Sequence, residues 1–164
     1  MGVETAFPIP GVERLILIPP LQQGRILGSP ETKFVVMEVL APERHSAPPR
    51  HLVPLHVHHR DDEAIYVLEG VLTIQTGDEV STTAAGSGVY IPSQTPHTFW
   101  NAGDAPVRFL VVMEPRIFLL IQELNLLPGR APEDVANVYR KCESSLLEPF
   151  GDAETGRAEV PSIR

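Results

Sequence analysis

Short apolar runs separated by turn-forming residues are the feature that most restricts the fold of this 164-residue chain. Turn signals at intervals of about 8–12 residues are typical of β-sandwiches and barrels. The 17 prolines favour the same class, because Pro interrupts helix interiors. No strand–helix–strand alternation appears, which argues against a doubly wound α/β fold. The expected strands are Leu55–His59, Ala64–Leu68, Val71–Thr76, Gly88–Ile91, His97–Asn101 and Val107–Met113.

Composition changes along the chain divide it into four segments. Residues Lys33–Leu40 (KFVVMEVL) are typical of a buried strand, and a shorter strand is expected at Leu15–Ile18. The Pro-rich residues 41–54 form a long loop, and such loops are often lids or binding segments. We therefore expect an N-terminal strand and loop segment at 1–32, a barrel at 33–115, a helical segment at 116–150 and a flexible tail at 151–164.

Two short helices are expected after the barrel. The first covers Ile117–Leu124. The second begins at Pro132, because Pro suits the first helical position and the acidic Glu133 and Asp134 complement the positive end of the helix dipole. Apolar residues then recur at helical spacing, which predicts packing against the barrel or a partner chain. This stripe consists of Val135, Val138, Tyr139, Cys142 and Leu146.

The charge balance restricts the possible partners. Thirteen basic and 21 acidic side chains give a formal net charge of −8, without a basic run, so we expect no nucleic-acid partner. The apolar runs are far shorter than the ~20 residues of a membrane-spanning helix, so we expect no membrane partner. The single cysteine, Cys142, cannot form an internal disulfide, and the N-terminus lacks a secretion-signal pattern. These features predict a cytoplasmic protein.

Histidines are concentrated in one part of the sequence. Five of the six lie between residues 45 and 59, and the sixth is His97. His56 and His58 are two apart in an expected strand, so both point to the same face. Glu63 lies near the start of the next strand, and a closed barrel can bring it and His97 to the same inner wall. The remaining histidines, interpreted as surface residues, are His45, His51 and His59.

Three imidazoles and one carboxylate form a mixed nitrogen and oxygen donor set. Such a set suits one divalent first-row transition-metal ion, namely Fe, Mn, Ni, Cu or Zn. Calcium and magnesium prefer more oxygen ligands. A six-coordinate ion held by these protein groups keeps open positions, which is typical of a reactive site, whereas structural zinc sites are closed.

Two gapped motifs resemble those of the cupin family. Residues 56–70 (HVHHRDDEAIYVLEG) are similar to the first cupin motif, and residues 86–101 (GSGVYIPSQTPHTFWN) are similar to the second. Arg50 and Gln94 stand where the family usually has glycine. The resemblance implies an all-β jelly-roll barrel, the cupin double-stranded β-helix, with short C-terminal helices. The matching positions are His56, His58, Glu63 and Gly70, followed by Gly86, Pro92, His97 and Asn101.

The segments around both motifs are similar to small bacterial cupins related to quercetin dioxygenase. The resemblance implies that His56, His58, Glu63 and His97 bind the metal, and the motif spacing favours Glu63 over Asp62. It further implies a homodimeric oxygenase for a small enolic or aromatic molecule, in which Glu63 takes a substrate proton. The same ligands serve metal-dependent isomerases, cyclases and decarboxylases across the superfamily, and a non-catalytic small-molecule-binding module is a third interpretation.

Strand alternation predicts which side chains lie near the metal. If Glu63 and His97 point inward, so do their neighbours of the same parity. Together with the last strand they would form a mostly apolar cavity suited to an aromatic or enolic ligand. Ordinary core packing is the alternative interpretation. No Lys or Arg falls at an inward position, which argues against a phosphosugar substrate, with Arg50 in the loop as the exception. The candidate pocket residues are Ile65, Val67, Phe99, Val111 and Met113.

Overall fold

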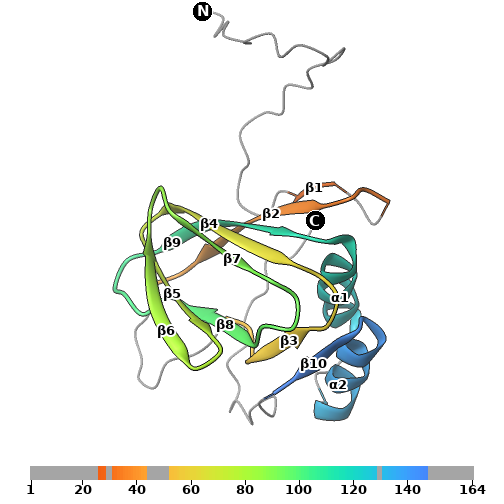
Figure 1. Cartoon of the computed structure of the whole chain (residues 1–164). Coiled ribbons are helices and arrows are strands. Elements are labelled where there is room, and N and C mark those ends of the chain that lie inside the picture. The colour runs from red at the N-terminus through yellow and green to blue at the C-terminus, as the bar shows by residue number, and fades with distance from the viewer. Residues whose placement is uncertain (1–25, 29–30, 44–51, 129–130, 148–164) are drawn as a thin grey trace, which may run out of the picture.

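Two antiparallel sheets face each other in this computed structural model, which describes residues 26–28, 31–43, 52–128 and 131–147 (Figure 1). One sheet has the strand order β1-β2-β9-β4-β7, and the other has the order β10-β3-β8-β5-β6. The first consists of β1 (Ile26–Leu27), β2 (Val35–Ala41), β9 (Val107–Met113), β4 (Glu63–Glu69) and β7 (Gly88–Ile91). The second consists of β10 (Ser144–Leu146), β3 (His56–His58), β8 (His97–Trp100), β5 (Val71–Thr76) and β6 (Glu79–Ala84). This arrangement is the double-stranded β-helix that the sequence predicts.

Several sequence predictions concern residues outside the described ranges. They are the strand at Leu15–Ile18, the tail at 151–164, most of the 41–54 loop, and the side chains of His45, Arg50 and His51.

The hydrophobic core lies between the two sheets. In β9 the inward side chains Val107, Phe109, Val111 and Met113 are buried, while the residues between them are half-buried. Phe109 of the first sheet meets Phe99 of the second edge-on, with ring centroids 5.6 Å apart. Burial of this shared apolar surface holds the sheets together, because each removes the other's inner face from water.

Strand β6 shows the limit of pattern-based prediction. The bounds of β5, β7 and β9 are those expected from the sequence. β6 is not anticipated, because nearly all of its side chains are exposed and no apolar alternation marks it. It is nevertheless a strand, since it pairs with β5 along its whole length, from Val71 opposite Ala84 to Thr76 opposite Glu79.

Two helices follow the barrel, α1 (Pro115–Leu126) and α2 (Pro132–Lys141), and both begin with Pro as the first helical residue. They form a second apolar cluster of Leu120, Val135, Val138, Tyr139 and Cys142, against which Leu146 packs. The prediction that the helical stripe continues to Leu146 is wrong. α2 ends at Lys141, and Glu143 adopts a φ of 50°, a left-handed conformation that reverses the chain into β10.

Strand β10 adds the C-terminal segment to the edge of the second sheet. Ser144 lies opposite His58, and Leu146 lies opposite His56. The backbone N–H of His59 also donates to the carbonyl of Glu143 at 2.9 Å. Residues 144–146 are therefore direct neighbours of the strand that carries two of the histidines (Figure 1).

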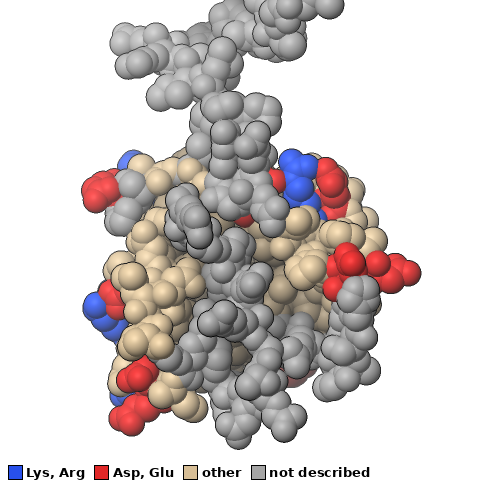
Figure 2. Space-filling view, turned by 180° about the vertical axis from the view of Figure 1, so that it is seen from behind, with Lys and Arg blue, Asp and Glu red and all other residues tan. Residues whose placement is uncertain are grey.

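Charged side chains on the described surface lie in mixed groups. Figure 2 shows basic side chains with acidic ones close by around the rim of one face. Arg108 pairs with Glu38 and Glu69, and Lys141 pairs with Glu123. Within the part of the chain that the structure describes, no helix has the length and apolar character needed to cross a bilayer.

Candidate metal centre

The four residues predicted to bind a metal meet between the two sheets. β3 supplies His56 and His58, the first residue of β8 is His97, and the first residue of β4 is Glu63. His56 and His97 are cross-strand partners in the second sheet, whereas Glu63 comes from the first sheet. One ligand atom from each residue lies within 4.8 Å of the others, and all four residues are buried. The barrel thus brings together residues up to 41 positions apart.

The donor atoms converge closely. The Nε2 atoms of His56 and His58 are 3.2 Å apart. Glu63 Oε2 lies 3.1 Å from His97 Nε2 and 3.5 Å from His58 Nε2. A group of nitrogen and oxygen donors that lie this close together on four buried residues matches the first coordination sphere of a transition metal.

Backbone carbonyls orient two of the imidazoles. Nδ1 of His56 is 2.8 Å from the carbonyl of Pro54, and Nδ1 of His97 is 2.8 Å from the carbonyl of Thr95. A carbonyl only accepts, so each Nδ1 carries a hydrogen and donates it. In the neutral ring Nε2 then has a free lone pair directed at the cluster. This is the tautomer that a metal-binding histidine needs.

The protonation states also suit a cation. Burial, followed by the nearby charges of His97 and His58, lowers the pKa of His56 from 6.5 to about 3, so its ring is neutral at neutral pH. Burial raises the pKa of the Glu63 carboxyl, but the adjacent His58 and His97 rings outweigh this effect and hold that pKa well below its usual range. Burial lowers the pKa of His97, and the hydrogen bond to Glu63 reverses this and raises it. The cluster therefore combines a neutral His56 ring with an ionised Glu63 carboxylate, a combination that suits a bound cation.

The comparison with known families agrees with this geometry. Residues 41–113 match the Cupin_2 family model, described as a cupin domain. These residues form a cupin domain. The histidine and glutamate cluster lies within the matched range, whereas α1, α2 and β10 lie beyond it.

Relatives of the cupin domain differ in their descriptions. An uncharacterized protein of Methanocaldococcus jannaschii is 34% identical over 61 residues, which cover 37% of this chain and 49% of that protein. The polyketide synthase CurC of Streptomyces cyaneus is 31% identical over 110 residues, 66% of this chain and 64% of that protein. The chain thus spans less than two thirds of the length of each of these curated relatives.

Solved structures give similar matches. A cupin protein of Bacteroides fragilis is 20% identical, with a TM-score of 0.49, and the match covers 63% of this chain and 86% of that one. A sugar phosphate isomerase of the cupin superfamily from Silicibacter pomeroyi is 28% identical, with a TM-score of 0.44, and the match covers 51% of each chain.

Two other residues of the cupin motifs shape the backbone. Gly70 has a φ of 83°, and a Cβ there would lie 2.9 Å from the carbonyl oxygen of Pro106, so the tight turn after β4 requires glycine. Asn101 is buried, and its side chain donates to the carbonyls of Pro42 and Ala105. It joins two loops.

Gln94 stands where the second motif usually has glycine, and it keeps the conformation that glycine favours. Its φ is 69°, in the left-handed region. Its backbone N–H donates to the carbonyl of His58 at 2.7 Å, and its side chain donates to the carbonyl of His59. These two bonds hold the turn before His97 against the end of β3.

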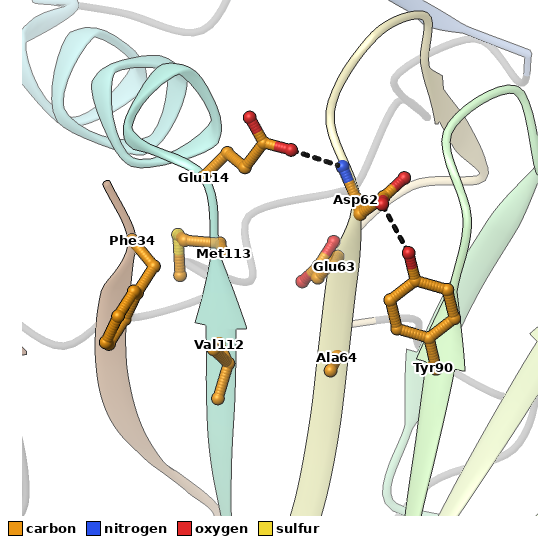
Figure 3. A pocket seen from close by; sticks show the side chains of 8 residues that line it. All are labelled: Phe34, Asp62, Glu63, Ala64, Tyr90, Val112, Met113 and Glu114. Carbon is orange, nitrogen blue, oxygen red and sulfur yellow. Dashed lines mark hydrogen bonds between the residues drawn. The ribbon is translucent and has the colours of Figure 1, made fainter.

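The two acidic residues before Glu63, Asp61 and Asp62, form contacts outside the ligand cluster. Asp62, the alternative ligand in the sequence, accepts hydrogen bonds from the Tyr90 hydroxyl and from the backbone N–H of Ser93, outside the cluster (Figure 3). Asp61 is buried and pairs with Arg116 of α1 at 3.3 Å.

The other histidine in the described part of the 45–59 group does not join the cluster either. His59 Nε2 instead lies 2.8 Å from Ser145 Oγ, which is not part of the cluster.

The five candidate pocket residues all point inward, into the apolar cluster between the sheets. Each is at most 6% exposed, and their contact with a substrate stays a prediction. They are Ile65, Val67, Phe99, Val111 and Met113.

Two residues beside the cluster are not predicted as site residues from the sequence. The Tyr139 ring of α2 meets the His56 ring edge-on at 5.7 Å, and Ser144 Oγ lies 2.8 Å from His58 Nδ1. Tyr139 belongs to an expected helical stripe, which indicates packing and not a site. Ser144 lies in a strand of three residues that no periodicity marks.

Proposed function

We propose that this chain binds one divalent first-row transition-metal ion and uses it to oxygenate a small enolic or aromatic molecule. The observation that carries the proposal is the convergence of three imidazole nitrogens and one carboxylate oxygen, all from buried residues, within 4.8 Å of one another. The proposed ligands are His56, His58, Glu63 and His97, and the donor set accepts Fe, Mn, Ni, Cu or Zn. When bound, such an ion supplies Lewis acidity and, for the redox-active metals, electron transfer.

Glu63 is the proposed base. It is the one carboxylate of the cluster, and its low pKa keeps it ionised. A substrate hydroxyl within hydrogen-bond reach would give its proton to Glu63 Oε2, which leaves the substrate as the more reactive anion. His58 Nε2 and His97 Nε2 lie 3.5 and 3.1 Å from this oxygen, so the proposed base lies within the ligand cluster.

The surroundings of the cluster support an aromatic or enolic substrate. The side chains that point inward beside it are apolar, namely Ile65, Phe99 and Met113 among others. Such a wall excludes water and packs against a ring, while the ligand cluster offers polar contacts at one end.

Metal analysis and oxygen uptake test the proposal. Untagged protein is expected to contain about one transition-metal ion per chain by elemental analysis, and the His56→Ala/His58→Ala variant is expected to lose it. Flavonols and other enediols are then assayed in an oxygen electrode. Full metal retention by the double variant would refute the site. Turnover without oxygen consumption would indicate an isomerase, cyclase or decarboxylase, and metal binding without turnover would indicate a binding module.

We further propose a homodimer formed through the outer face of the β1-β2-β9-β4-β7 sheet. Phe34, Tyr66 and Tyr90 are 60%, 46% and 62% exposed there, although large apolar side chains usually avoid water. Phe34 and Tyr90 border a cleft of about 140 Å³ floored by Ala64 and Val112 (Figure 3). Light scattering after size exclusion is expected to give the mass of two chains, and a Phe34→Asp/Tyr90→Asp variant the mass of one. A monomeric wild type would refute this.

The single cysteine supports a cytoplasmic location as part of the same proposal.

A further inference from the structure

Strand β10 places a serine behind one of the metal ligands. Ser144 lies opposite His58 in the β10–β3 pairing, and its Oγ is 2.8 Å from His58 Nδ1. Both residues are 2% exposed, and they are 86 positions apart in the sequence. Ser144 also lies beyond residues 41–113, which form the cupin domain.

We propose that Ser144 is a positioning residue of the metal centre. Its hydroxyl oxygen accepts the Nδ1 hydrogen of His58, which fixes the tautomer and the ring orientation that direct the Nε2 lone pair at the ion. This inference rests on the proposed function, because it assumes that the cluster binds a metal.

The direction of the hydrogen bond follows from a second contact. Ser144 Oγ lies 3.1 Å from the carbonyl oxygen of Cys142. A hydroxyl has one hydrogen and a carbonyl has none to give, so the bond between them uses the serine hydrogen. The lone pairs of Oγ then remain for the Nδ1–H of His58. The opposite arrangement would put a hydrogen on His58 Nε2 and block that nitrogen as a ligand.

His58 differs in this respect from the other two imidazoles. His56 and His97 donate to carbonyls that lie two residues before them, at Pro54 and Thr95. Those partners come with the local backbone of each ligand. The partner of His58 arrives only when β10 pairs with β3, so the C-terminal segment completes the metal centre.

Ion pairs hold the start of β10 in place. Arg116 of α1 contacts Glu143 at 2.5 Å and the buried Asp61 at 3.3 Å. Asp61 belongs to the loop between β3 and β4, which joins the strands of three ligands. Arg116 therefore connects this loop to the residue just before Ser144. The ion pair at Glu143 and the pairing of β10 with β3 together determine the position of Ser144.

A pair of adjacent serines provides a matched test. Ser145 Oγ lies 2.8 Å from Nε2 of His59, which is outside the cluster, so Ser145→Ala removes a similar bond without touching a ligand. The dissociation constant for Co²⁺ is measured by visible absorption and chelator competition, together with the Tm of each metal-free variant. Loss of an outer-shell partner typically weakens metal binding by roughly 10–100-fold, which is expected for Ser144→Ala and not for Ser145→Ala. Equal Co²⁺ affinity in the two alanine variants would overturn the proposal.

A second pair of variants addresses folding. Thr and Val have the same shape, and only Thr keeps the hydroxyl. Ser144→Thr is expected to bind Co²⁺ more tightly than Ser144→Val by a similar factor, and equal affinity in these two would also overturn the role of the hydroxyl. A wild type that binds no metal would instead refute the proposed function.

Discussion

The buried histidine cluster is expected to make the metal-free protein sensitive to mild acid, chiefly through His56. Burial and the neighbouring charges of His97 and His58 lower the pKa of His56 to about 3 in the folded state. In the unfolded chain a histidine titrates near 6.5. Between these two values the unfolded state binds a proton that the folded state does not bind. The free energy of unfolding therefore falls as the pH decreases from 6.5 toward 3.

The size of the effect follows from the difference between the two pKa values. One pH unit corresponds to about 1.4 kcal/mol, so the whole interval from 6.5 to about 3 amounts to about 5 kcal/mol. The part between pH 6.5 and 5 amounts to about 2 kcal/mol, which is a large share of the stability of a small domain. Most carboxyl groups stay ionised in this upper part of the interval, so the change in stability there reports on the histidine.

Urea unfolding in EDTA at several pH values between 7.5 and 5 measures how the free energy of unfolding of the metal-free protein changes with pH. Wild type is expected to lose about 2 kcal/mol more than His56→Gln over that range, because Gln does not take up a proton. His59→Gln, which changes a histidine outside the cluster, is expected to follow the wild-type profile. If wild type and His56→Gln lost stability in parallel, the folded-state pKa of His56 would not be depressed, and the reasoning would fail.

Three further predictions concern other parts of the molecule. The Gln94→Gly variant is expected to be more stable than Gln94→Ala by about 1 kcal/mol in unfolding free energy, because only Gly adopts a φ of 69° without strain. Equal unfolding free energies of the two variants in urea would contradict this. Arg108→Met is expected to lower the Tm, because the carboxylate of Glu38 is 1% exposed and loses its partner, and a second change, Glu38→Met, is expected to restore much of it. Chelation is expected to remove about 4 kcal/mol of stability from protein held at free metal 1,000 times the Kd, measured by thermal unfolding. The His56→Ala/His58→Ala variant should not respond to chelator, and a response would indicate a different metal site.

Local sequence patterns were sufficient for the parts of the fold whose two strand faces differ. In β9 the apolar run from Val107 to Met113 is interrupted only by Arg108, so the run predicts a strand and Arg108 marks its outward face. The same holds for the ligands, because His56 and His58 share a strand face and the motif spacing includes Glu63 and His97. A buried strand face and a short motif can both be recognised from residues that lie close together in the sequence.

Strands β6 and β10 could not be found in this way. β6 is exposed along nearly its whole length, and β10 has only three residues, so neither shows an apolar period. Each is a strand because its backbone pairs with a neighbour, and backbone groups are the same in every residue type. For the same reason the helical spacing through Leu146 was misleading: pairing with β3 and the left-handed φ of Glu143 outweighed it.

The proposed metal ligands could thus be listed from the two motifs and the family that they resemble, whereas the orientation of the rings required the assembled barrel. His56 and His97 obtain their hydrogen-bond partners from carbonyls two residues away, but the motif says nothing about Ser144, which reaches His58 across 86 positions. A contact between residues so far apart in the sequence forms only after β10 pairs with β3, and the sequence of neither strand predicts this pairing.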